Sequence, residues 1–121
     1  MTLHFKSFAV LAAVAACGLL SACRTAPTSL YQWEGYQPQV YEHFKGGSAE
    51  QQIAVLEKDL QAIDAGGKVP PPGYHAHLGY LYSMTGKQDQ MVVQFQEEKK
   101  LFPESAVYMD FLMAKIQKSE K

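Results

Sequence analysis

The clearest pattern of apolar and polar positions lies in residues 48–65, where aliphatic side chains recur at helical spacing. Four residues at intervals of three, four and three positions form this stripe: Ile53, Leu56, Leu60 and Ile63. Such spacing places them on one side of a helix. Ser48 precedes Gln51 by three positions, which is the spacing of a capping box. Because Gly66 and Gly67 follow, the pattern predicts an amphipathic helix from Ser48 to Ala65.

Two further helical patterns occupy residues 74–103 and predict an antiparallel pair. The first helix covers Tyr74–Met84 and is followed by Gly86, and the second covers Asp89–Leu101 and ends at Pro103. Four residues of the first helix share the side that faces the second: His75, Leu78, Gly79 and Tyr82. Three residues lie on the opposite side: Ala76, Tyr80 and Ser83. In tetratricopeptide repeats, which this pair resembles, that side of the first helix lines the groove where ligands lie, and the resemblance makes Tyr80 and Ser83 candidates for a ligand-binding face.

An aromatic segment precedes these helices and one more helix follows them. Five aromatic residues fall within residues 31–44: Tyr31, Trp33, Tyr36, Tyr41 and Phe44. They either cover the helix pair as part of its core or form a docking patch, since Trp and Tyr are favoured interface anchors. Different residues can serve each purpose. A last helix is predicted over Glu104–Lys118, with residues 119–121 frayed. Its expected apolar stripe consists of Tyr108, Phe111, Leu112 and Ile116.

The N-terminus has the pattern of a secretory signal. Residues 1–22 carry a cationic start and an apolar run from Phe8 to Leu20, which is shorter than the about 20 residues of a membrane span. The sequence Leu20-Ser21-Ala22-Cys23 resembles the lipobox of bacterial lipoproteins. That resemblance implies that Cys23 becomes the mature N-terminus, linked to diacylglycerol and N-acylated, with residues 23–29 as a polar tether. The residue after Cys23 is Arg24 and not the Asp that typically retains such lipoproteins in the inner membrane, so we expect an outer-membrane destination.

Composition argues against nucleic-acid binding and against thiol chemistry. Loss of residues 1–22 removes one base and no acid, which leaves twelve acids against ten bases and no basic face for nucleic acid. It also removes Cys17, and lipidation uses Cys23, so no thiol remains for a disulfide, a metal site or a nucleophile. No cofactor is expected beyond the covalent lipid.

Candidate catalytic and metal-binding residues are few. His75 and His77 are two positions apart, and on a helix they point in nearly opposite directions, so they cannot share one ion. Glu57 and Asp64 are spread along a polar helix face and are interpreted as surface charge. We therefore expect neither an enzyme nor a metal site.

The helix pair resembles a tetratricopeptide repeat. The resemblance rests on the spacing of six residues: Leu78, Gly79, Tyr82, Gly86, Phe95 and Pro103. It implies a short all-α domain over residues 30–118, in which flanking helices complete the hairpin. Met91 and Glu98 depart from the repeat pattern, which has small residues there. Because Glu98 is costly to bury without a partner, we expect residues 97–100 to form a solvated face and no standard stacking there.

A second resemblance covers most of the chain after the signal. Residues from Leu30 to about Phe111 resemble a family of small bacterial lipoproteins, the domain-of-unknown-function family 4810. Five stretches carry it: Leu30-Tyr31-Gln32-Trp33, Glu50-Gln51-Gln52-Ile53, the link 69–73, residues 75–82 and Leu101-Phe102-Pro103-Glu104-Ser105. The resemblance implies an outer-membrane lipoprotein of no known activity, often encoded beside a lipoprotein resembling the curli secretion channel and a second small lipoprotein.

A single repeat pair cannot bury its own apolar faces, so a remaining face should contact another protein. The sequence thus predicts an outer-membrane-anchored, periplasm-facing, protein-binding adaptor in an envelope or secretion complex, with a curli-channel-like lipoprotein as one candidate partner. The alternative is a pilotin-like chaperone that escorts a pore subunit to the outer membrane. The candidate partner-binding residues are Trp33, Tyr36, Tyr80 and Ser83.

Overall fold

The computed structural model describes residues 29–119, and over that range the chain is entirely helical, without strands. Its elements, in chain order, are α2 (Tyr36–Phe44), α3 (Ala49–Ala65), α4 (Tyr74–Met84), α5 (Gln88–Leu101), the 3-10 turn η2 (Pro103–Ser105) and α6 (Ala106–Ser119). The predicted all-α class is confirmed. The predicted signal sequence, the lipidation site Cys23, all of the tether except Ser29, and residues 120–121 lie outside the described residues.

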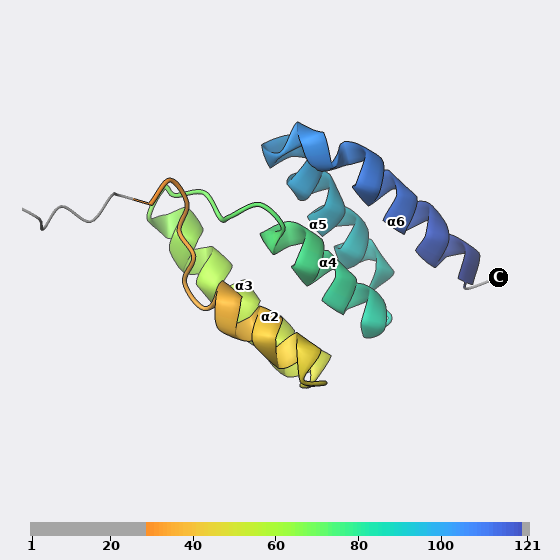
Figure 1. Cartoon of the computed structure of the whole chain (residues 1–121), viewed down its shortest axis with the longest axis horizontal. Helices are drawn as coiled ribbons and strands as arrows, with labels where there is room; N and C mark the ends of the chain where they lie inside the picture. The colour runs from red at the N-terminus through yellow and green to blue at the C-terminus, as the bar shows by residue number, and fades with distance from the viewer. Residues whose placement is uncertain (1–28, 120–121) are drawn as a thin grey trace, which may run out of the picture.

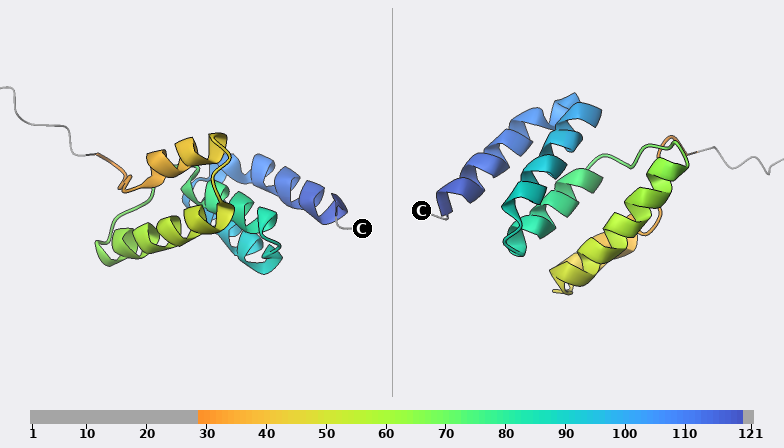
Figure 2. Two further views of the ribbon diagram at one scale, coloured as in Figure 1. Left: turned by 90° about the horizontal axis from the view of Figure 1, so that it is seen from below. Right: turned by 180° about the vertical axis from the view of Figure 1, so that it is seen from behind.

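The helices are arranged as packed hairpins in chain order. Figure 1 shows α2 beside α3, then α4 beside α5, with α6 on the far side of the second hairpin from the first. The two other views in Figure 2 show the same order, with α6 farthest from α3. Predicted helix boundaries in α3, α4 and α5 agree with the structure to within one residue.

In the first hairpin, α3 forms as its pattern predicts. The hydroxyl oxygen of Ser48 accepts a hydrogen bond from the backbone N–H of Gln51 at 3.3 Å, which caps α3. Three residues of the predicted stripe are buried and Leu60 is half-buried against them. The backbone N–H of Gly35 donates to the carboxylate of Asp59 at 2.9 Å, which holds the start of α2 against α3.

The second hairpin is closely packed because Gly79 has no side chain. A Cβ atom at this position would lie 2.7 Å from two ring carbons of Phe95, closer than real contacts allow. Beside it, His75 is buried and its Nδ1 donates to Oε1 of Gln94 at 2.6 Å. The predicted inward-facing set of α4 is therefore confirmed, and His75 is a packed imidazole.

Glu98 contradicts the predicted solvated face of residues 97–100. Its side chain is only 2% exposed, and its carboxylate accepts hydrogen bonds from the backbone N–H groups of Gly73 at 2.7 Å and Ala76 at 3.2 Å. The first amides of a helix have no partner within the helix and carry partial positive charge. The start of α4 thus supplies the partner that burial of this acid requires.

Two tyrosines of α4 connect the hairpins. The hydroxyl of Tyr74 donates to the backbone oxygen of Leu56 at 2.7 Å, and both residues are fully buried. The hydroxyl of Tyr82 donates to the carboxylate of Glu57. The prediction of Glu57 as surface charge was therefore incomplete, because this exposed residue also binds a buried hydroxyl. Asp64 is exposed, as predicted.

Two of the four residues predicted for the packing face of α6 do not pack on the core. Four apolar residues of α6 contact the core: Met109, Leu112, Met113 and Ile116. Tyr108 and Phe111, which were expected among them, are exposed. An ion pair of 2.5 Å joins Lys99 of α5 to Asp110 of α6, and the flexible methionines fill the space against the hairpin.

Candidate functional site

Five rings form a continuous row between α2 and α4. The ring centroids of Trp33 and Tyr36 are 6.2 Å apart, and those of Tyr36 and His77 are 5.9 Å apart. His77 is 5.2 Å from His43, which is in turn 5.7 Å from Tyr80. These spacings are within the range of favourable ring contacts. We call these five residues the aromatic row.

The helical spacing of the two helices builds this row. Tyr36 and His43 are seven positions apart, which places them on one side of α2. His77 and Tyr80 are three positions apart on the neighbouring side of α4. Trp33 precedes α2, and its backbone oxygen accepts a hydrogen bond from the N–H of Tyr36 at 3.0 Å. This turn holds the indole against the Tyr36 ring.

The two ends of the row are open to solvent while its centre is half-buried. Trp33 is 40% exposed at one end and Tyr80 is 42% exposed at the other. Phe44, whose ring centroid lies 5.9 Å from that of His43, is 83% exposed and adds to the second end. Exposed large aromatics beside one another are typical of protein-binding surfaces.

His77 and Tyr36, in the half-buried centre of the row, are neutral at neutral pH. Burial, and then the neighbouring His43, lower the pKa of His77 to about 4. Neither ring nitrogen of His77 has a hydrogen-bond partner within residues 29–119. Burial, and then the negative charge of Glu98, raise the pKa of the Tyr36 hydroxyl. An aromatic surface of this kind suits apolar or aromatic side chains of a partner.

The structure brings together three of the four predicted partner-binding residues, namely Trp33, Tyr36 and Tyr80. Ser83 lies one turn beyond Tyr80, and its hydroxyl donates to the Tyr80 backbone oxygen at 2.6 Å, so its proton is already used. Phe44 was among the aromatic residues considered for a docking patch, but sequence reasoning had assigned no binding role to His43 or His77. The signal for these two was helical spacing, seven positions from Tyr36 to His43 and three from His77 to Tyr80.

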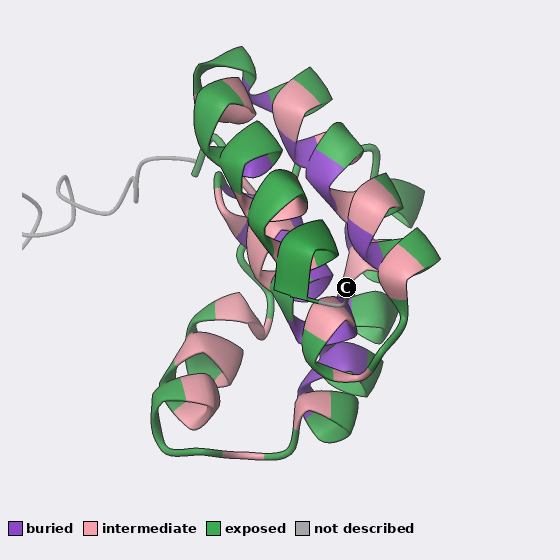
Figure 3. Cartoon of the chain, turned by 90° about the vertical axis from the view of Figure 1, so that its right-hand side faces the viewer, coloured by how far each residue is buried: buried purple, intermediate pink, exposed green. Residues whose placement is uncertain are grey.

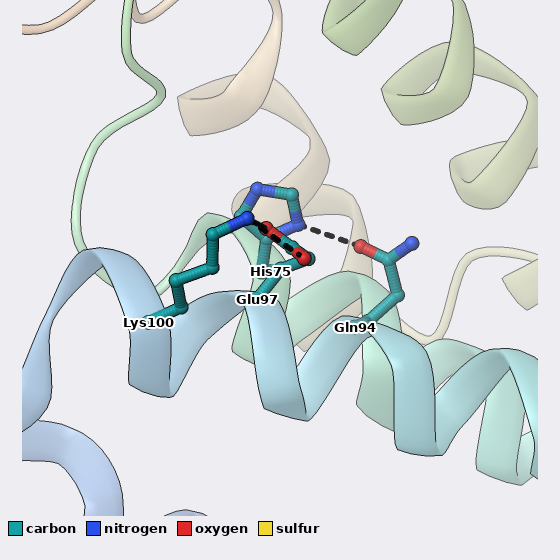
Figure 4. Close-up of polar contacts among 4 residues, drawn as sticks. All are labelled: His75, Gln94, Glu97 and Lys100. Atoms are coloured by element: carbon teal, nitrogen blue, oxygen red, sulfur yellow. Dashed lines mark hydrogen bonds and ion pairs between the residues drawn. The ribbon is translucent and has the colours of Figure 1, made fainter.

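A pocket of about 280 Å³ opens on another side of α4, between α3, the link of residues 66–73 and α5. His75, Gln94 and Glu97 line it. Figure 4 shows two polar contacts at this pocket: His75 binds Gln94, and Glu97 forms an ion pair with the neighbouring Lys100 at 3.2 Å. Because these three lining residues have partners within the fold, we assign the site to the aromatic row.

The described residues hold no metal site and no membrane span. Within residues 29–119, no group of three or more His, Cys, Asp or Glu side chains is arranged to bind a metal ion. No helix of that range has the length and apolar character needed to cross a bilayer.

Comparison with known proteins finds one family. The family described as "Domain of unknown function (DUF4810)" matches residues 30–112, which cover α2 to α5, η2 and half of α6. No match is found among the curated proteins or among the solved structures.

Proposed function

The chain belongs to the DUF4810 family, and from that premise we propose that it is a lipid-anchored, protein-binding adaptor of the bacterial outer membrane. In this proposal the aromatic row is the binding surface for a protein of an envelope or secretion complex. The observation that carries it is the row itself, an aromatic surface exposed at Trp33 and Tyr80, with exposed Phe44 beside its second end.

Several features support a repeat-type scaffold for this surface. The close approach of Gly79 to Phe95, two hairpins side by side and an additional helix resemble the arrangement of tetratricopeptide repeats. In such scaffolds the first helices of successive hairpins line one groove, and the corresponding helices here are α2 and α4. The aromatic row lies between these two helices. We propose that a partner segment lies along it.

The proposed anchor rests on the sequence of the N-terminus. Residues 20–23 resemble a lipobox, and a diacylglycerol on Cys23 with a further acyl chain gives stable attachment, at about 0.8 kcal/mol per buried methylene. Only a few residues separate Cys23 from Leu30, the first residue of the matched domain. The adaptor would therefore work close to the membrane surface.

A photo-crosslinking experiment tests the binding surface. A benzoyl-phenylalanine in place of Trp33 or Tyr80 should trap one stable envelope partner in intact cells. The control is the same probe at Gln61, an exposed residue of α3 away from the row, which should trap nothing specific. If the probes in the row trap no partner, or the same species as Gln61, the row is not a binding surface.

Two further observations test the anchor and the alternative. Cys23→Ala should release the protein from membranes, and continued membrane attachment would contradict lipidation. A pilotin-like chaperone would be dispensable once its client has reached the outer membrane, and the client would be mislocalised without it. An adaptor would instead remain crosslinked to its partner at steady state.

A further inference from the structure

α6 carries a second apolar face that packs on no other part of residues 29–119. Val107 is 84% exposed, Tyr108 60% and Phe111 54%, whereas the face around Met109 is buried against the hairpin. Figure 3, in which α6 runs to the C-terminus, shows exposed residues along its outward side. A helix with two apolar faces can bury only one of them on its own domain, and the other is available to a partner.

The exposed face is shaped to receive one large side chain. A shallow depression of about 250 Å³ is lined by Phe111, Ala114, Lys115 and Lys118. Ala114, Lys115 and Lys118 lie three, four and seven positions after Phe111. Four residues at this spacing surround a hole into which a side chain of a facing helix can pack. A side chain from a facing helix would fill it. The aliphatic part of Lys115, whose ammonium lies 5.4 Å from the centre of the Phe111 ring, forms one wall.

A second copy of α6 supplies a suitable side chain. Tyr108 lies on the same face, stacked on Phe111 at 6.5 Å and 18°. In an antiparallel pair of α6 helices centred on Phe111, a residue that precedes Phe111 in one copy faces the residue that follows Phe111 by the same number of positions in the other copy. Tyr108 is three positions before Phe111 and would therefore face Ala114, inside the depression of the other copy.

Charges at the two ends of α6 favour the same register. Lys118 lies near the end of α6, seven positions after Phe111. Glu104 lies in η2, seven positions before Phe111 and just before the start of α6, and both residues are exposed. Neither forms an ion pair within residues 29–119. An antiparallel pair brings Glu104 of each copy against Lys118 of the other, whereas a parallel pair would bring the two Lys118 side chains together. Antiparallel helix dipoles also attract each other.

We propose that α6 binds α6 of a second copy of this chain, antiparallel, with Phe111 beside the two-fold axis. Tyr108 of each copy fills the depression of the other, and two Glu104–Lys118 pairs close the ends. Such an isologous contact is the commonest form of homodimer. Because α6 has only 14 residues, about 21 Å, the contact is smaller than a standard stable interface and the dimer is weak.

The test uses two full-length copies with different affinity tags, mixed in mild detergent, and measures the co-capture of one by the other. Glu104→Lys or Lys118→Glu present in both copies creates two like-charge contacts and should weaken association about tenfold. Phe111→Glu should abolish it. Lys58→Glu on α3 and Val93→Glu on α5, both exposed, are matched controls that should leave it unchanged. Circular dichroism verifies that every variant is folded.

The decisive measurement uses a chain that carries both Glu104→Lys and Lys118→Glu, in both copies. In an antiparallel pair this exchange restores both opposite-charge contacts, so co-capture should return to near the wild-type level, whereas in a parallel pair like charges still face each other. If co-capture is not restored, the face binds in another geometry or binds another protein's helix, and the proposal is overturned. This holds even if Phe111→Glu abolishes co-capture. Absence of wild-type co-capture, or co-capture insensitive to all these changes, would also overturn it.

Discussion

The carboxylate of Glu98 on α5 accepts a hydrogen bond from the backbone N–H of Gly73, at 2.7 Å, at the start of α4. The second carboxylate oxygen accepts from the N–H of Ala76 at 3.2 Å. A side chain on one helix of the hairpin thus caps the other helix, in place of a capping residue in the sequence before α4. Gly73 itself provides no side-chain cap.

Glu98→Ala should therefore lower the free energy of unfolding substantially. It leaves two amides at the start of α4 without their charged acceptor, and we expect a loss of about 2–4 kcal/mol in urea denaturation followed by circular dichroism. Glu97→Ala is the matched control. Its partner Lys100 is exposed, so its loss should cost no more than about 0.5 kcal/mol. Equal effects of the two substitutions would show that Glu98 is not the cap.

Features that depend on contacts between neighbours in sequence were predicted correctly, and features that depend on distant contacts were not. Periodicity and the caps around Ser48 and Gly66 depend on neighbours in sequence, so α3, α4, α5 and α6 were predicted to within one or two residues. The partner of Glu98 lies 25 positions away, and no local pattern indicates it.

The same reason explains the errors in α6 and in the site. A helix with apolar residues on two faces does not specify which face packs, and the contacts of α6 with the hairpin, including the Lys99–Asp110 pair, are tertiary. Tyr36 was predicted as a site residue because Trp and Tyr are favoured interface anchors, and Tyr80 because it lies on the side of the first helix away from the second. The contact between His43 and His77 depends on how α2 docks against α4 and was not predicted.

Gly79→Ala should destabilise the second hairpin. The added Cβ would lie 2.7 Å from Phe95 and 3.2 Å from Cβ of Gln94, so α5 must shift or the Phe95 ring must leave its position. We expect a loss of about 1–3 kcal/mol in the free energy of unfolding. Gly66→Ala provides the control, because a Cβ there makes ordinary contacts at 3.4 Å or more and φ is −79°. A neutral Gly79→Ala would contradict the close approach of the two helices.

His77 should make the protein less stable in acid. Its pKa is lowered from 6.5 to about 4 in the folded chain, so the folded state favours the neutral ring. As the pH falls from about 6.5 to about 4, the unfolded chain binds a proton that the folded chain does not, and the free energy of unfolding decreases. After allowance for solvent screening of a half-buried ring, we expect a loss of about 1–2 kcal/mol.

The measurement for His77 compares two pH profiles. His77→Phe keeps an aromatic ring in the row without a titrating group, and its stability should fall less than that of the wild type between pH 7 and pH 4.5. Titratable groups that do not contact His77 are present in both proteins and cancel in the difference. Parallel profiles would show that His77 is not the group responsible.

Phe44→Ser should separate binding from folding. Phe44 is 83% exposed beside His43, so its removal should change the free energy of unfolding by no more than about 0.5 kcal/mol. If the aromatic row binds a partner, loss of an exposed aromatic anchor should reduce affinity about tenfold or more. The readout is the yield of crosslinked partner from a probe at Trp33. Val93→Ser, an exposed apolar residue on α5, should leave that yield unchanged. An unchanged yield in Phe44→Ser would exclude this end of the row from the binding surface.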